Sequence, residues 1–347
     1  MNTFTIAGQT IAPGERVQFN LPGAALYTNT PLDMPVEVIH GRRPGPTLLV
    51  CAGVHGNELN GVEIIRRLRT LPTLNRLKGT LILVPVVNLH GFINRSRYLP
   101  DRRDLNRCFP GSESGSLGSR VAYLFFNEIA SRATHIVDLH TAAVHRENLP
   151  QIRADLENPV IRELALSFSI PVIVHSRIIE KSLRSEAGNQ GIAVITYEAG
   201  EGLRLSETAI VTGVRGIIST MRNIGMLTKS RSKKSINPNI AYGSKWFRAE
   251  SDGLFRPLAE LGSRVKEGDT LGVVSSPFSS DDVPILSSVD GIVIGQNKHP
   301  LVNEGEALFN VGIFKRAAAV EEDISSHEED ILSDPLYEPE QVDDVDL

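Results

Sequence analysis

Two potential metal ligands stand three residues apart where an apolar stretch ends. Residues 48–68 read LLVCAGVHGNELNGVEIIRRL and place His55 and Glu58 between strand-forming residues and an amphipathic stretch. A strand that leads through a glycine-rich turn into a helix presents side chains at the carboxyl edge of an α/β sheet, where ligands bind. Residues three apart at a helix start point the same way. Because short H-x-x-E matches are frequent by chance, the pair alone is weak evidence for a metal site.

A third candidate ligand, His140, ends another apolar run in IVDLHTA, which places it at the same edge of the expected sheet. Two His and one Glu with an open fourth position form a ligand set of catalytic zinc. A single His at a strand end is more often structural, but three candidates at strand ends favour one zinc ion per chain. Asp138 could orient a ligand, or could simply form the turn at the strand end.

A catalytic zinc needs a base beside its water, and Glu198 is the candidate. This residue ends the apolar run VITYEAG, where a carboxylate has no evident packing role. It could take the proton of the attacking water and deliver it to the leaving nitrogen. The alternative, a surface salt bridge, suits Glu201 better.

An irregular, arginine-rich stretch, NRSRYLPDRRDLNRCFPG, follows the second expected strand of this series. A charge run is usually a solvated face, but here Tyr, Leu, Phe and Pro residues interrupt it and suggest an ordered loop. Arginine is well suited to bidentate recognition of carboxylates. The sequence contains no H-E-x-x-H, G-x-S-x-G or phosphate-binding G-x-x-x-x-G-K motif.

Alternating strand-like and helix-like segments predict an α/β fold with a mostly parallel mixed sheet flanked by helices. Strands are expected at 47–54, 79–88, 134–142, 170–175 and 192–200, and helices at 58–69, 120–130, 158–168 and 206–221. The polar stretch after His140 either belongs to a surface loop or lines a pocket with His145, Arg146, Asn148, Gln151 and Arg153.

The pattern changes along the chain and predicts four parts. Residues 1–227 form the α/β domain with a short N-terminal β segment, and the basic residues 228–240 form a linker. Residues 241–316 form a small all-β, barrel-like domain that resembles half-barrels of biotinyl and lipoyl carriers but lacks their modified lysine hairpin. Residues 317–347 contain twelve Asp or Glu and no Lys or Arg, and are expected to be a disordered acidic tail.

Composition narrows the functional classes. No apolar run approaches the roughly 20 residues of a membrane span, and the N-terminus does not read as a secretory signal. Two cysteines are too few for a disulfide framework, so a cytoplasmic location is expected. Without the acidic tail the formal charge of −5 becomes +7, but no basic stripe interleaved with aromatics indicates nucleic-acid binding.

The motifs GVHGNE, RYLPDRRDLNRCFPG, DLHTA and YEAG, in this order, resemble the succinylglutamate desuccinylase and aspartoacylase family of the zinc carboxypeptidase-like clan. The resemblance covers residues 47–226 and is closest to an uncharacterised branch. It implies zinc bound by His55, Glu58 and His140, with Glu198 as the general base. It also implies that Arg97 polarises the scissile carbonyl and stabilises the oxyanion, although Arg102 or Arg103 could face the metal instead.

The resemblance further implies a group of substrate-binding residues: Asn106, Arg107, Asp104, Arg103 and Arg153. The leading hypothesis is therefore a zinc amidohydrolase that deacylates an N-acyl amino acid or a similar small amide bearing a carboxylate. The alternatives are a zinc carboxypeptidase acting on a peptide or modified protein tail, and a non-catalytic binding protein. The expected partner is a small N-acyl amino acid or short peptide, with no nucleic acid and no membrane, and the chain could form a homo-oligomer.

Overall fold

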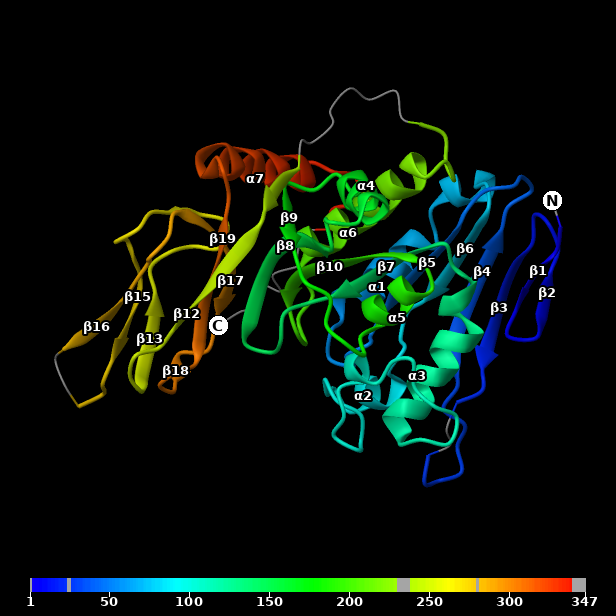
Figure 1. Ribbon diagram of the computed structural model, residues 1–347, viewed down its shortest axis with the longest axis horizontal. Helices are drawn as coiled ribbons and strands as arrows, with labels where there is room; N and C mark the ends of the chain where they lie inside the picture. Colours follow the sequence, from blue (N-terminus) through cyan, green and yellow to red (C-terminus); the bar gives the residue numbers. More distant parts are fainter. Residues whose placement is uncertain (1, 24–25, 230–237, 279–280, 339–347) are drawn as a thin grey trace, which may run out of the picture.

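The chain begins with strands, and strands and helices then largely alternate from residue 47 to residue 223 in the computed structural model, which describes residues 2–23, 26–229, 238–278 and 281–338 (Figure 1). The strands of this part are β1 (Phe4–Ile6), β2 (Gln9–Ile11), β3 (Arg16–Leu21), β4 (Met34–His40), β5 (Thr47–Ala52), β6 (Thr80–Val84), β7 (His135–His140), β8 (Arg146–Ala154), β9 (Val172–His175) and β10 (Ala193–Glu201). The helices are α1 (Asn60–Leu68), α2 (Leu89–Ile93), α3 (Leu117–Glu128), α4 (Pro159–Ser167), α5 (Leu183–Asn189) and α6 (Glu207–Asn223), with short 3₁₀ helices η1 (Pro72–Arg76), η2 (Leu105–Arg107) and η3 (Ala130–Arg132).

One large mixed sheet organises the molecule. Its strands follow the order β12-β19-β17-β8-β10-β7-β5-β6-β4-β3, with β9, β11 and β14 joined beside this path. The neighbours β10, β7, β5 and β6 are all parallel, whereas β8 at one side and β4 at the other are antiparallel to them. The predicted mostly parallel sheet flanked by helices is confirmed. The carboxyl ends of its parallel strands share one edge.

The sheet is buried on both faces, as the near-continuous apolar strands predict. Successive side chains of a strand point to opposite faces. In β5, Leu48 and Val50 join a core with α1, α4 and α6, whereas Leu49 and Cys51 join a second core with α3 and α5. The strand ends are therefore held rigidly at the edge where the candidate ligands lie.

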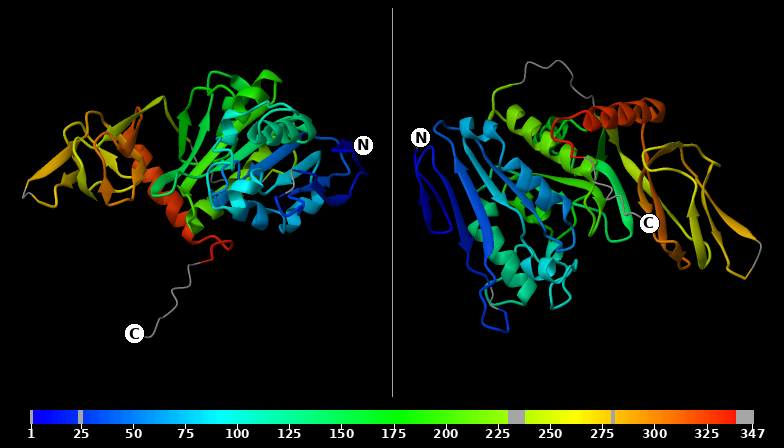
Figure 2. Two further views of the ribbon diagram at one scale, coloured as in Figure 1. Left: turned by 90° about the horizontal axis from the view of Figure 1, so that it is seen from below. Right: turned by 180° about the vertical axis from the view of Figure 1, so that it is seen from behind.

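Some of the C-terminal strands continue this sheet, and the others form a second one. They are β11 (Asn239–Ala241), β12 (Gly243–Arg248), β13 (Gly253–Pro257), β14 (Arg264–Val265), β15 (Thr270–Ser275), β16 (Asp282–Leu286), β17 (Gly291–Asn297), β18 (Leu301–Val302) and β19 (Ala307–Ile313). Strand β17 pairs with β8, and a second sheet in the order β16-β15-β13-β18 packs against this extension. Figure 2 shows these strands projecting from one end of the body.

The predicted all-β character of the C-terminal part agrees with these strands, but the division into domains stays a prediction. The centre of the predicted linker, residues 230–237, lies outside the described residues. The end of that linker is not a free connection, because β11 pairs with β9.

The prediction of a disordered acidic tail is wrong for its first half. Residues Ala317–Leu332 form helix α7, which lies across the junction between the main body and the C-terminal strands (Figure 1). Its buried residues Val320, Ile324 and Ile331 form an apolar stripe against α6 and β17. Acidic side chains occupy the rest of the helix surface, so the helix buries apolar area without burying its charge. Residues 339–347 lie outside the described part.

Two elements near the site were not predicted. Strand β8 occupies the polar stretch after His140, and the short helix α5 follows β9. Strand β8 lacks a clear apolar alternation because several of its polar residues are enclosed by neighbouring strands. Among the described residues, no helix is long and apolar enough to cross a membrane. The cytoplasmic location and the homo-oligomer stay predictions.

Candidate metal centre and active site

A tight turn after β5 carries two of the three candidate ligands. Gly53 has φ +61°, and a Cβ on Gly56 would lie 1.9 Å from the carbonyl carbon of Gly91 in α2. Only glycine permits this approach of one backbone to another. The turn is thereby packed against α2, and it presents His55 and Glu58 before α1 begins.

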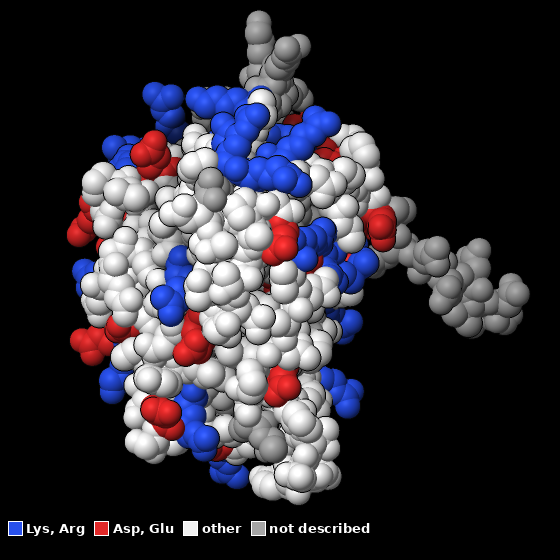
Figure 3. Space-filling model, turned by 90° about the vertical axis from the view of Figure 1, so that its right-hand side faces the viewer, with Lys and Arg blue, Asp and Glu red and all other residues white. Residues whose placement is uncertain are grey.

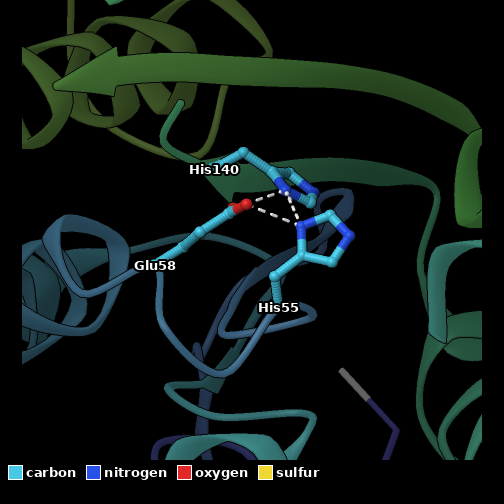
Figure 4. A group of neighbouring side chains, drawn as sticks. All are labelled: His55, Glu58 and His140. Carbon is cyan, nitrogen blue, oxygen red and sulfur yellow. Dashed lines mark hydrogen bonds and ion pairs between the residues drawn. The ribbon is translucent and has the colours of Figure 1, made fainter. Parts of the chain in front are cut away.

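The third candidate, His140, meets this turn because it ends β7, the parallel neighbour of β5. The two oxygens of Glu58 lie 2.7 Å from His55 Nδ1 and 2.8 Å from His140 Nδ1, and the two Nδ1 atoms are 3.2 Å apart (Figure 4). The three residues are 3%, 2% and 4% exposed for His55, Glu58 and His140. The structure thus brings the predicted ligands together in a buried cluster from two strand ends.

A carboxylate holds the outer nitrogen of each imidazole. Asp104 Oδ1 lies 3.0 Å from His55 Nε2, and Asp138 Oδ2 lies 2.8 Å from His140 Nε2. Metal-binding histidines commonly use their second nitrogen in this way, which fixes the ring and leaves the first nitrogen for the ion. Of its two predicted roles, Asp138 therefore has the geometry of the orienting one.

The carboxylates around the cluster stabilise positive charge on its two imidazoles. Burial alone lowers the pKa of His55, but the charge of Glu58 and the hydrogen bonds with Asp104 and Glu58 outweigh it and raise the pKa. Burial is likewise outweighed at His140, whose pKa is raised well above its usual value by the charges of Asp138 and Glu58. Burial raises the pKa of Glu58, yet the two imidazoles lower it to far below its usual range.

These residues fit a zinc ion. Two imidazole nitrogens and a carboxylate are zinc ligands, and their atoms lie close enough together to share one ion. In a tetrahedral site, ligand atoms are roughly 3.3 Å apart, given zinc bonds of about 2.0–2.1 Å. The three carboxylates Glu58, Asp104 and Asp138 around two imidazoles supply the negative charge that a divalent cation would balance.

A cavity of about 210 Å³ opens beside the cluster, and both predicted catalytic residues line it. Glu198 lies in β10, three residues before its end, and is the register partner of His140, the last residue of β7, so the two residues lie side by side at the sheet edge. Arg97 donates to Glu58 Oε1 at 3.3 Å and to Asp104 Oδ2 at 3.0 Å. Arg97, and neither Arg102 nor Arg103, is the arginine at the cluster.

The predicted substrate residues occupy different places. Asn106 and Arg107 line the cavity, although Asn106 Oδ1 also accepts the backbone N–H of Leu183 at 2.9 Å. Asp104 lies behind His55, where it orients the ring. The prediction for Arg103 is wrong, because its side chain is 60% exposed and turns to Asp101 at 3.6 Å, outside the cavity.

Two further arginines line the cavity and come from different elements. Arg153, which was predicted, comes from β8, and Arg184 comes from α5. Arg153 Nε and Arg184 Nη1 are buried without a hydrogen-bond partner among the described residues. Burial, with the charge of Arg153, lowers the pKa of Arg184. The second terminal nitrogen of Arg184, Nη2, donates to Ser176 Oγ and to the backbone oxygen of Arg177.

Sequence reasoning missed Arg184 because the segment around it is polar and short. A usable signal was Ser182, whose side chain caps α5 by accepting the N–H of Ser185. A Ser N-cap between two apolar strands predicts a helix start at the sheet edge, with the next residues in its first turn.

Comparison with known proteins agrees with the resemblance. Residues 44–224 match the succinylglutamate desuccinylase/aspartoacylase catalytic domain family. A deacetylase of N-alpha-acetyl-L-2,4-diaminobutyric acid from Halomonas elongata is 23% identical over 79% of this chain and 84% of its own. A succinylglutamate desuccinylase from Pseudomonas aeruginosa is 30% identical, over 40% of this chain and 43% of its own.

Solved structures share the fold. A succinylglutamate desuccinylase/aspartoacylase from Rhodobacter sphaeroides is 24% identical, with a TM-score of 0.76 over 86% of this chain and 96% of its own. The ectoine utilization protein EutE from Ruegeria pomeroyi, solved with product bound, is also 24% identical, with a TM-score of 0.76 over 86% of this chain and 95% of its own.

Proposed function

Because this chain belongs to the succinylglutamate desuccinylase/aspartoacylase family, we propose that it is a zinc-dependent hydrolase that removes the acyl group from an N-acyl amino acid. The observation that carries the proposal is the buried His55, Glu58 and His140 cluster, open to a cavity that Glu198 and Arg97 also line. The two enzyme relatives are a deacetylase and a desuccinylase, and both names describe removal of an acyl group from an amino acid derivative.

The three residues of the cluster and the two catalytic candidates each have a defined role in the proposed reaction. His55, Glu58 and His140 would hold the zinc ion, which when bound polarises a carbonyl and makes a water more acidic. Glu198 accepts a proton from the attacking water and passes it to the leaving nitrogen. The guanidinium of Arg97 faces the negative charge that develops on the carbonyl oxygen.

The arginines indicate an acidic substrate. Arg153 and Arg184 both line the cavity, and each has a buried nitrogen without a hydrogen-bond partner among the described residues; a carboxylate is the group that pairs best with two such guanidinium groups. Arg107, with Asn106, offers a second cationic place in the lining of the same cavity. We therefore propose a small N-acyl amino acid with two carboxylates, one for Arg153 and Arg184 and one for Arg107 with Asn106.

The test begins with metal and activity. We expect one zinc per chain by elemental analysis in wild type and in Glu198→Gln, and none in His55→Ala. Hydrolysis of N-acetyl and N-succinyl derivatives of aspartate and glutamate should fall by roughly 10²–10⁴-fold in Glu198→Gln, the usual contribution of a general base. Glu201→Gln is the matched control, because Glu201 shares β10 but pairs with Arg204 outside the cavity.

Other outcomes would point elsewhere. Zinc that persists in His55→Ala would refute the proposed ligand set. Release of terminal residues from peptides, with no deacylation, would replace the proposal by a carboxypeptidase. A zinc-free wild type that binds N-acyl amino acids without cleaving them would replace it by a binding protein.

A further inference from the structure

Strand β8 lies between the strand that carries the candidate base and a strand from the C-terminal part. On one side it pairs with β10, where Asn148 lies opposite Gly200, two residues after Glu198. On the other side it pairs with β17, where Asn148 lies opposite Gly295. The ladders β8–β10 and β17–β19 are each irregular next to these glycines. Asn148 therefore stands between two positions without side chains.

The side chain of Asn148 points to Glu198. Asn148 is 7% exposed, and its Nδ2 donates to Glu198 Oε2 at 3.1 Å. The side-chain oxygen Oδ1 of Asn148 lies next to β17, because a Cβ built on Gly295 would lie 3.0 Å from it. That separation is tighter than an ordinary van der Waals contact, so a side chain there would push the amide away from its present position.

The C-terminal part also holds β8 along its length. The buried Gln151 side chain donates through Nε2 to Ile294 O on β17 at 3.0 Å and to Leu149 O on β8 at 3.1 Å. At the other end of the pairing, the backbone N–H of Lys298 donates to His145 O at 2.8 Å. The position of Asn148 is thereby tied to β17 on both sides.

We propose that Asn148 is a positioning residue for Glu198, and that the C-terminal strands act on the reaction by keeping Asn148 in place through β17 and Gly295. This inference rests on the proposed role of Glu198 as the general base. A carboxylate whose Oε2 is held by an amide N–H cannot rotate freely, so the hydrogen bond fixes the orientation of the Glu198 side chain at the cavity that it lines. Proton transfer depends steeply on such placement.

The reaction step is a simple proton relay. Water gives one proton to Glu198 as its oxygen bonds to the amide carbon, and the protonated Glu198 gives that proton to the nitrogen as the carbon–nitrogen bond breaks. The carboxylate is thereby regenerated. Asn148 exchanges no proton in either step and only keeps its hydrogen bond to Oε2.

The experiment compares Asn148→Ala, Gly295→Ala and Gly243→Ala in the zinc-loaded full chain. We expect kcat to fall roughly 10–100-fold in Asn148→Ala, as for a misplaced catalytic group, with KM and zinc content nearly unchanged. Gly295→Ala should lower kcat in the same direction by a smaller factor. Gly243→Ala is the matched control, because a Cβ there meets nothing within 4 Å.

Zinc content and thermal midpoint show whether each variant is folded, and a crystal structure of Asn148→Ala gives the orientation of Glu198 independently of activity. If Glu198→Gln loses activity but Asn148→Ala keeps its kcat, the positioning role is wrong and the proposed function stands. If Gly295→Ala equals Gly243→Ala, the role of the C-terminal strands is wrong. If no N-acyl amino acid is hydrolysed, the proposed function fails. In that case the crystal structure of Asn148→Ala still tests the positioning role, and an unchanged orientation of Glu198 would overturn it.

Discussion

Each histidine of the cluster is oriented by a carboxylate at its Nε2 atom, and the two carboxylates come from different parts of the chain. Asp138 precedes His140 by two residues on β7 and so lies on the same face of the strand. Asp104 instead comes from the arginine-rich loop, and besides His55 it accepts from the backbone N–H of Asn106 at 2.9 Å. One loop thereby orients a candidate ligand and begins the cavity wall at Asn106.

The arginine of α5 gives a residue-scale prediction. Replacing Arg184 with Met removes donors that would otherwise bind a substrate carboxylate, and hydrogen bonds to charged groups contribute about 1.5–3 kcal/mol each. We expect KM for an acidic N-acyl amino acid to rise roughly 10–100-fold with little change in kcat, measured by steady-state kinetics. Arg177→Met is the control, because that exposed side chain lies outside the cavity lining. An unchanged KM in Arg184→Met would contradict the assignment.

At the scale of elements, helix α7 attaches the C-terminal strands to the main body. It packs on α6 and on β17 and β14, so it touches both parts of the extended sheet. One residue of its buried stripe is polar: His327 Nε2 lies 3.3 Å from Thr212 Oγ1 on α6, and its Nδ1 has no hydrogen-bond partner among the described residues. The helix therefore has a titratable group in its interface.

That histidine makes the docking of α7 sensitive to acid. Burial, helped by the charge of Arg215 and opposed by Asp330, lowers the pKa of His327 to about 4. The unfolded chain binds this proton near pH 6.5, above the folded pKa, so stability is full above about pH 6.5 and falls as pH decreases towards 4. The loss should be on the order of 3 kcal/mol, since the pKa falls from 6.5 to about 4 on folding and one pKa unit corresponds to about 1.4 kcal/mol.

Hydrogen exchange of α7 between pH 7.5 and 4.5 measures this effect. We expect smaller protection factors for its amides at the lower pH in wild type, once the slower intrinsic exchange in acid is taken into account, and a weaker pH dependence of these protection factors in His327→Gln, which cannot titrate. An equal pH dependence of the two proteins would show that another group is responsible.

At the scale of the whole molecule, positive charge is not confined to the site. Figure 3 shows Lys and Arg gathered at one end of the face that carries the N-terminal strands. The exposed Arg42, Arg43, Arg76 and Lys78 precede β5 and β6, at the strand ends opposite to the candidate ligands. The charge of +7 calculated without the acidic tail therefore includes basic residues outside the site. Attraction of an acidic substrate does not account for all of this charge.

Metal removal should lower the stability of the whole fold, because a site built from β5, its following turn and β7 exists only when the sheet is formed. A ligand at 100 times its Kd stabilises the folded state by about 2.7 kcal/mol. For a chain of this size we expect a fall in Tm of roughly 4 °C on chelation, measured by calorimetry. His55→Ala should show no such shift, and an equal fall in that variant would mean that the chelator acts elsewhere.

The sequence by itself determined the elements and residues whose signals are local. Apolar runs that end in Gly-Val-His-Gly-Asn-Glu, Asp-Leu-His and Tyr-Glu-Ala-Gly predict strands with functional ends, and parallel strands share one carboxyl edge. From this rule alone His55, Glu58, His140 and Glu198 were expected at one site, and the structure places them there.

The tertiary structure decided what depends on residues far apart in the chain. Asn148 reaches Glu198 only because polar β8 is enclosed by β10 and β17, and Arg184 reaches the cavity only through the placement of α5. Arg103 and Arg97 have the same residue type within one loop, yet the backbone turns the first outward and the second to the cluster. Helix α7 forms because α6 and β17 cover its apolar stripe, and this burial stabilises the helix. The composition of the segment alone does not indicate that such a partner surface exists.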